Sequence, residues 1–98
     1  MQKDLEKILL NLRKLTPFLA SNYHVSSLEI FGSFVRDEQK VKSDLDLLVS
    51  FSETPSLLKF IKLKNFLTEH LQIKVDLVMK DSLKPRLREN ILNESIAV

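Results

Sequence analysis

The chain has 98 residues, 44% of them hydrophobic and 29% charged, a mixture that is typical of a globular protein and excludes a disordered chain. Its formal net charge of +2 does not favour direct nucleic-acid binding, and the absence of cysteine excludes disulfide bonds and thiolate metal sites. Charged side chains are spread through the first twenty residues, and no apolar run reaches membrane-spanning length. We therefore expect a cytoplasmic protein with a single domain over residues 1–98 and no membrane contact.

The first predicted element is an amphipathic helix over residues 2–15. Its apolar side chains recur at helical spacing, and they are Leu5, Ile8, Leu9, Leu12 and Leu15. We expect Pro17 to kink or end this helix, because proline lacks a backbone donor and clashes with the preceding turn. Residues 27–31 alternate and predict a short strand, which Gly32 ends. A short helix is predicted to open from that break over residues 33–38.

The middle of the chain predicts a strand, a helix and a further strand. Residues 44–51 predict the first of these strands. Thr54 and Pro55 are expected to start the helix, because a hydroxyl suits the N-cap and proline suits the first helical position. This helix is expected to run to about His70, and residues 73–79 predict the next strand.

The C-terminal part predicts a last helix and a short tail. Asp81 or Ser82 is expected to cap this helix, with Pro85 tolerated in its first turn. Three apolar side chains of the helix are expected to face the core, and they are Leu83, Leu87 and Ile91. Residues 95–98 predict a short strand or a docked tail. The alternation of helices and strands favours an α/β sandwich whose strands are mostly not joined as hairpins.

Two aspartates stand one residue apart in the strand predicted over residues 44–51. On a strand, Asp44 and Asp46 share one face and lie about 6.6 Å apart along the backbone, so their charges repel. Mg²⁺ relieves such repulsion in two-metal phosphoryl-transfer sites. If the strand that carries Asp76 is a neighbour, this third acid completes a triad. Two acids on a strand more often occupy a solvated sheet face, but Asp76 and the upstream glycine turn favour a site here.

The only glycine of the chain, Gly32, is followed at once by Ser33. A residue without a Cβ lets a phosphate approach the backbone closely, and Ser33 would stand at a helix N-terminus, which favours an anion. Arg36 is three residues further on and could reach a phosphate oxygen from the same side. Alone, this pair would be read as an ordinary strand-to-helix turn with Ser33 as its N-cap.

The stretch GSFVRDEQKVKSDLDLLVSF, residues 32–51, resembles the nucleotidyltransferase superfamily that includes DNA polymerase β. It is most similar to the minimal nucleotidyltransferases, small proteins that are often paired with a HEPN-domain toxin. The resemblance rests on the Gly-Ser pair, the ten-residue spacing to Asp-x-Asp, the third acid Asp76 and the chain length. It implies an α/β (α+β) nucleotidyltransferase fold, in which a small mixed sheet packs against about four helices.

The resemblance also implies an activity and its residues. The chain would be a Mg²⁺-dependent nucleotidyltransferase that transfers AMP from ATP to a hydroxyl of a HEPN toxin and acts as its antitoxin. Gly32 and Ser33 would hold the nucleotide. Asp44 and Asp46 would bind two Mg²⁺ ions, and Asp76, as metal ligand or base, would help activate the hydroxyl.

Other interpretations stay open at this point. A non-catalytic antitoxin would neutralise its toxin by binding alone, and Asp37, which stands where the family usually has glycine, is the one feature that favours this alternative. A transferase acting on a small molecule would usually carry a further domain for its acceptor. The sequence indicates neither the acceptor residue nor the nucleotide base, and it leaves a homo-oligomer open.

Overall fold

The computed structural model describes residues 3–40 and 43–98 of the chain. In chain order the elements are α1 (Lys3–Tyr23), β1 (Val25–Phe31), the 3₁₀ turn η1 (Gly32–Phe34), β2 (Leu45–Phe51), α2 (Leu57–Leu71), β3 (Val75–Met79), the 3₁₀ turn η2 (Lys80–Ser82), α3 (Pro85–Glu94) and β4 (Ile96–Ala97). The strand order is β3-β2-β1-β4, with β2 and β3 parallel and the other pairs antiparallel. The predicted small mixed sheet is confirmed, and the described ranges hold three α-helices where about four helices were predicted.

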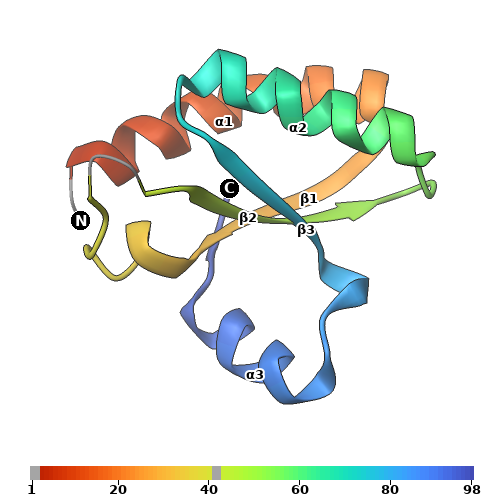
Figure 1. The fold of residues 1–98 in the computed structure, drawn as a ribbon. Coiled ribbons are helices and arrows are strands. Elements are labelled where there is room, and N and C mark those ends of the chain that lie inside the picture. The colour runs from red at the N-terminus through yellow and green to blue at the C-terminus, as the bar shows by residue number, and fades with distance from the viewer. Residues whose placement is uncertain (1–2, 41–42) are drawn as a thin grey trace.

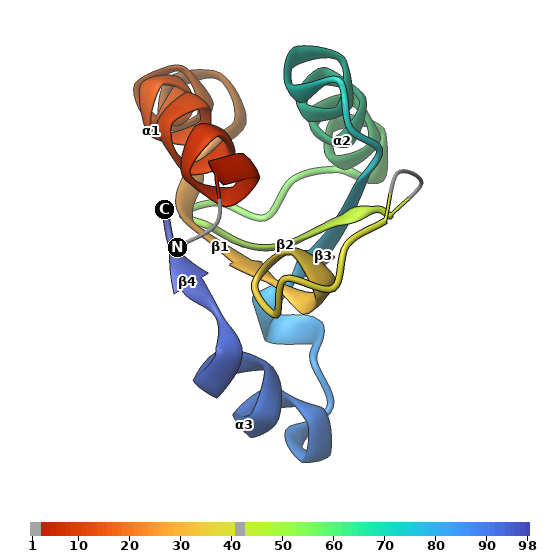
Figure 2. The same cartoon turned by 90° about the vertical axis from the view of Figure 1, so that its left-hand side faces the viewer.

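The molecule has two unequal layers around this sheet. Helices α1 and α2 cover one face, whereas α3 lies on the opposite side (Figures 1 and 2). The core lies between the sheet and the two covering helices, and its fully buried side chains include Leu12, Leu19, Ile30, Leu45, Leu47, Leu63, Leu67 and Val75. No helix within the described residues is long and apolar enough to cross a membrane.

The helix predicted over residues 2–15, with Pro17 expected to kink or end it, is longer in the structure, because α1 continues through Pro17 to Tyr23. Proline cannot donate to the carbonyl of Arg13, four residues earlier. The hydroxyl of Thr16 donates to that carbonyl instead, at 2.7 Å. Beyond the proline, Leu19 is fully buried, so packing of the apolar stripe extends the helix.

The start of α2 also differs from the sequence prediction, by two residues. The N-cap is Ser56, whose hydroxyl accepts a hydrogen bond from the backbone N–H of Lys59 at 3.2 Å. Thr54 and Pro55 precede this cap. The predicted end near His70 is confirmed, because α2 ends at Leu71.

Helix α3 differs most from its prediction. Asp81 and Ser82 lie in η2 rather than at the cap, which is Lys84, with Pro85 at the first helical position. No residue of α3 is buried, so the expectation that its apolar side chains face the core is wrong. The reason is that α3 lies on the side of the sheet that α1 and α2 do not cover (Figure 1). The predicted short terminal strand is confirmed as β4, which pairs with β1.

Candidate active site

The single glycine follows β1 directly and has a φ of +80°, a conformation that side chains with a Cβ rarely adopt. A Cβ built on Gly32 would overlap the Oδ2 atom of Asp46 and lie 3.0 Å from its Cγ atom. Phe31 pairs with Asp46 across the sheet, which brings the turn beside this carboxylate. The turn therefore needs glycine for two independent reasons, its dihedral angle and its contact with Asp46.

The predicted helix over residues 33–38 is wrong, because η1 is a 3₁₀ turn that spans only Gly32–Phe34. The Gly32 carbonyl accepts from the N–H groups of Val35 at 3.1 Å and Arg36 at 3.3 Å. Ser33 lies inside this turn rather than at its N-cap, which is Phe31. Periodicity alone could not distinguish this tight turn from the start of a longer helix.

The three acids meet on the sheet face opposite α1 and α2. Strands β2 and β3 are parallel neighbours, and their register places Asp46 opposite Asp76, so the condition for a triad with Asp76 is met. Asp44 stands one residue before β2. The alternating Leu45 and Leu47 point into the core, so Asp46 points to the other face.

Crowding of these carboxylates changes the acidity of Asp46. Burial, the nearby charges of Asp76 and Asp44 and a hydrogen bond with Asp76 raise the pKa of Asp46 to about 6, against the opposing effect of Arg36. Lys74 Nζ lies 3.9 Å from Asp44 Oδ2 on an exposed side chain, where such a pair contributes little. The face therefore carries negative charge that its own cations do not balance.

This donor set fits Mg²⁺ at an open site. In the described part of the chain no three acidic or histidine side chains form a cluster that could hold a metal ion, so the acids are not a closed cage. Mg²⁺ prefers hard oxygen donors, and it commonly takes one or two protein carboxylates together with waters and substrate phosphates. Asp44 and Asp46 supply such carboxylates beside a turn that suits a phosphate, and the raised pKa of Asp46 reflects the charge that a cation would balance.

We expect Asp46→Asn to stabilise the metal-free protein at neutral pH. The pKa of Asp46 is higher in the folded chain than its ordinary 3.8, so the folded state binds the proton more tightly and stability falls as the pH rises from about 4 to 6. Asparagine mimics the protonated acid. Allowing for partial exposure, the gain should be about 1–2 kcal/mol at pH 7.5 and near zero at pH 4.

Urea unfolding in a chelating buffer at both pH values measures this difference. Asp81→Asn, which removes the same charge from an exposed side chain, serves as the control. An equal effect of Asp46→Asn at both pH values would contradict the crowding of the three carboxylates.

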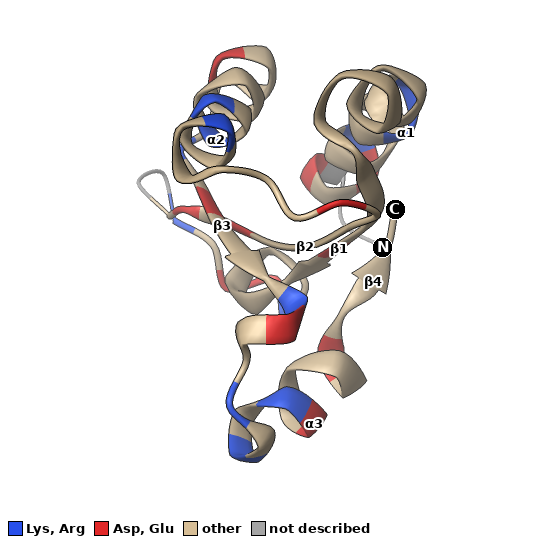
Figure 3. Ribbon diagram, turned by 90° about the vertical axis from the view of Figure 1, so that its right-hand side faces the viewer, with Lys and Arg blue, Asp and Glu red and all other residues tan. Residues whose placement is uncertain are grey.

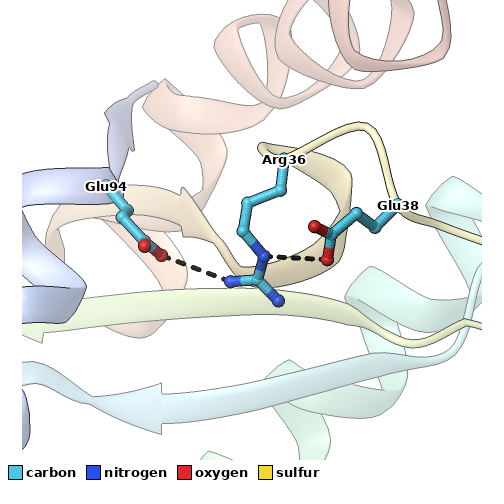
Figure 4. Close-up of polar contacts among 3 residues, drawn as sticks. All are labelled: Arg36, Glu38 and Glu94. Atoms are coloured by element: carbon cyan, nitrogen blue, oxygen red, sulfur yellow. Dashed lines mark hydrogen bonds and ion pairs between the residues drawn. The ribbon is translucent and has the colours of Figure 1, made fainter.

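Arg36, the predicted phosphate ligand, links the turn to α3. Its Nε donates to Glu38 Oε2 at 3.1 Å and its Nη1 to Glu94 Oε2 at 3.2 Å (Figure 4). The hydrogen bond with Glu38 contributes most to raising the pKa of Arg36, and the contact with Glu94 raises it further. These two bonds use two of the five N–H groups of the guanidinium, and its other N–H groups are donors of the kind that a phosphate oxygen accepts from.

Asp37 stands where the family that the sequence resembles usually has glycine. The backbone conformation at this position suits glycine. Its φ is +58°, which glycine adopts at no cost and aspartate tolerates better than most residues. The side chain of Asp37 is exposed. The conformation of the turn is therefore kept although the glycine is not.

A second polar cluster on the same face was not predicted. Lys80 Nζ donates to Glu29 Oε1 and Ser95 Oγ donates to Glu29 Oε2, each at 2.7 Å. Burial opposes ionisation of Glu29, but these bonds outweigh it and hold its pKa below the ordinary value. Lys80 lies in η2, before α3, and Ser95 is the C-cap of α3, so one carboxylate on β1 binds a residue on each side of this helix.

A pocket of about 480 Å³ adjoins the segment that leads from η1 to β2. It is lined by Asp4, Lys7, Ile8, Asn11, Phe34, Gln39, Lys40, Ser43, Leu71 and Ile73. These residues come from α1, the segment that leads from η1 to β2, and the connection between α2 and β3. None of the three predicted catalytic acids lines the pocket, although Ser43, which does, directly precedes Asp44.

Comparison with known proteins identifies similar chains. Residues 12–98 match the sequence model of the nucleotidyltransferase domain family. The protein adenylyltransferase MntA of Thermococcus cleftensis is 48% identical over 80 residues, which are 82% of this chain and 81% of that protein.

Solved structures share the fold. One described as a minimal nucleotidyltransferase is 38% identical, covers 94% of both chains and superposes with a TM-score of 0.78. A complex of a tri-AMPylated HEPN toxin from Shewanella oneidensis with its MNT antitoxin matches 92% of this chain and 70% of the other, at 23% identity and a TM-score of 0.67.

Proposed function

This chain belongs to the nucleotidyltransferase domain family, among the minimal nucleotidyltransferases, and is an enzyme of that family; we propose that it transfers AMP from ATP to a hydroxyl of a HEPN toxin and so acts as its antitoxin. The observation that carries the proposal is the packing of the Gly32 turn against Asp46, with Asp76 directly opposite on the next strand. A turn that admits a phosphate thereby adjoins an acidic face that suits Mg²⁺. The names of the similar proteins support adenylyl transfer and a HEPN partner.

In the proposed reaction the nucleotide binds on the side of the glycine turn and the acceptor on the side of Asp76. Backbone N–H groups of the turn and the Ser33 hydroxyl bind the triphosphate, and Arg36 donates to it with N–H groups other than the two that bind Glu38 and Glu94. Asp44 and Asp46 would hold two Mg²⁺ ions, whose charge would offset that of the triphosphate and of the transition state.

The acceptor approaches from the side of Asp76, whose side chain is exposed while that of Asp46 is half-buried. The acceptor oxygen forms a bond to the α-phosphorus, the bond from that phosphorus to the bridging oxygen breaks, and pyrophosphate leaves. The carboxylate of Asp76 takes the hydroxyl proton.

Co-expression with the HEPN protein of the same organism tests the proposal. We expect the wild-type chain to add one or more AMP units to that protein, seen by intact mass spectrometry, and Asp44→Asn/Asp46→Asn to add none. Glu69→Gln/Asp81→Asn, which removes two charges from exposed side chains, should transfer like the wild type. If the HEPN protein stays unmodified but is neutralised equally by the wild type and the Asp44/Asp46 variant, the chain is a binding antitoxin and the enzymatic proposal is wrong.

A further inference from the structure

One face of α3 is turned towards the nucleotide side of the site. Leu87, Ile91 and Glu94 are spaced i, i+4 and i+7, so they follow one stripe along the helix. Glu94 lies 3.2 Å from Arg36, which follows the glycine turn (Figure 4). Because the three side chains share a stripe, Leu87 and Ile91 are directed to the same side as Glu94.

This stripe is apolar and accessible. Leu87 is 53% exposed and Ile91 is partly exposed, although large apolar side chains usually contribute to a core. Exposed leucines are common on protein surfaces, and Leu57 and Leu58 of α2 are exposed too. Those two, however, belong to a helix that covers the opposite face of the sheet from the acids (Figure 1).

The position of the stripe is fixed by polar contacts rather than by burial. Glu29 holds Lys80 before α3 and Ser95 after it, each at 2.7 Å, and Arg36 holds Glu94. These contacts hold η2, the C-cap of α3 and its last residue, so the helix presents its apolar residues in a defined place. A surface that is fixed before binding loses less conformational entropy when a partner docks.

We propose that the Leu87–Ile91 stripe receives apolar side chains of the acceptor segment that flank its hydroxyl in the partner protein. The proposal rests on the proposed function. The triphosphate is anionic and is directed to the turn and Arg36, whereas the stripe carries no charge except that of Glu94, which is ion-paired with Arg36. The nucleotide is assigned to the turn, which leaves the stripe for the acceptor. Holding the acceptor hydroxyl in place lowers the barrier to transfer.

Charge at the start of α3 fits the same partner. Lys84, Arg86 and Arg88 are exposed there (Figure 3). These cations would attract acidic residues of the acceptor protein and repel a basic one. The occupant we infer is thus a protein segment with apolar residues next to the acceptor hydroxyl and acidic residues nearby.

Leu87→Asp tests this inference, with Leu58→Asp as a matched control, because both leucines are exposed and the change is the same. With the HEPN protein as acceptor, we expect Leu87→Asp to raise the KM for that protein at least about tenfold, equivalent to about 1.4 kcal/mol. The Kd for Mg·ATP and the melting temperature should stay at wild-type values. Leu58→Asp should change none of these quantities. Leu87→Met, which keeps an apolar side chain at this position, should have the wild-type KM.

Two outcomes would overturn the inference. In one, Leu87→Asp transfers AMP to the HEPN protein with an unchanged KM. In the other, it weakens Mg·ATP binding as much as transfer, which would assign the stripe to the nucleotide. Failure of the proposed function looks different, because the wild-type chain itself would then leave the HEPN protein unmodified.

Discussion

Replacing Gly32 with alanine is expected to lower the free energy of unfolding by about 2–5 kcal/mol. Adopting a φ of +80° costs an alanine about 1–2 kcal/mol, and a Cβ that overlaps the Asp46 carboxylate adds a cost of about 1–3 kcal/mol. Relief of the overlap would displace either the turn or Asp46. Since a displacement near 1 Å can reduce a rate about 100-fold, AMP transfer should fall by at least that factor.

Urea unfolding and a transfer assay on the same protein measure both effects. Ser27→Ala, a substitution on an exposed position of β1, is the control and should behave like the wild type. The double variant Gly32→Ala/Asp46→Gly separates the two causes, because it removes the overlapping carboxylate and leaves the strain in φ. It should recover part of the lost stability and none of the activity. Wild-type stability of Gly32→Ala would contradict the close packing of the turn against Asp46.

Asp76→Asn should reduce AMP transfer about 100- to 10,000-fold and leave most of the affinity for Mg·ATP. The reason is the position of Asp76, which is exposed on β3, one strand further from the glycine turn than Asp46. Asparagine keeps the size of the side chain but cannot take the proton of the acceptor hydroxyl. A change in rate without a change in nucleotide affinity identifies a group that acts on the acceptor.

Asp81→Asn is the control, since it removes the same charge from an exposed side chain close to the end of β3. Calorimetry with Mg·ATP and mass spectrometry of the HEPN protein give the two readouts. If binding and transfer collapse together in a protein that still folds, Asp76 holds the metal of the nucleotide and does not serve the acceptor.

The sequence predicts the centre of the site because its signals are local. The period of two residues on a strand puts Asp44 and Asp46 on one face, and a lone glycine after a strand marks a turn. The sequence predicts the pairing of Asp46 with Asp76 only on the condition that their strands are neighbours. The parallel register of β2 and β3 satisfies that condition.

The surroundings of the site have no local signal. Arg36 and Glu94 are 58 residues apart, and Glu29 and Ser95 are 66 residues apart, so no periodicity connects them. The spacing of the apolar residues on α3 indicates a helix with one apolar face but does not say what that face meets. In α1, a local rule about Pro17 was overridden by packing of residues beyond it, which propensity does not contain.

The binding of Glu29 to η2 and to the residue after α3 has a consequence for how this region opens. Loss of the two bonds of this carboxylate would release the segments on both sides of α3 at once, and of the polar contacts described above only the ion pair of Arg36 with Glu94 would still hold the helix. No residue of the helix is buried, so little apolar surface opposes that release. The segment from η2 to β4 should therefore behave as one cooperative unit with a lower opening free energy than the core. Binding of a second protein along α3 would close this unit, so its amide exchange rates would report on the occupancy of that face.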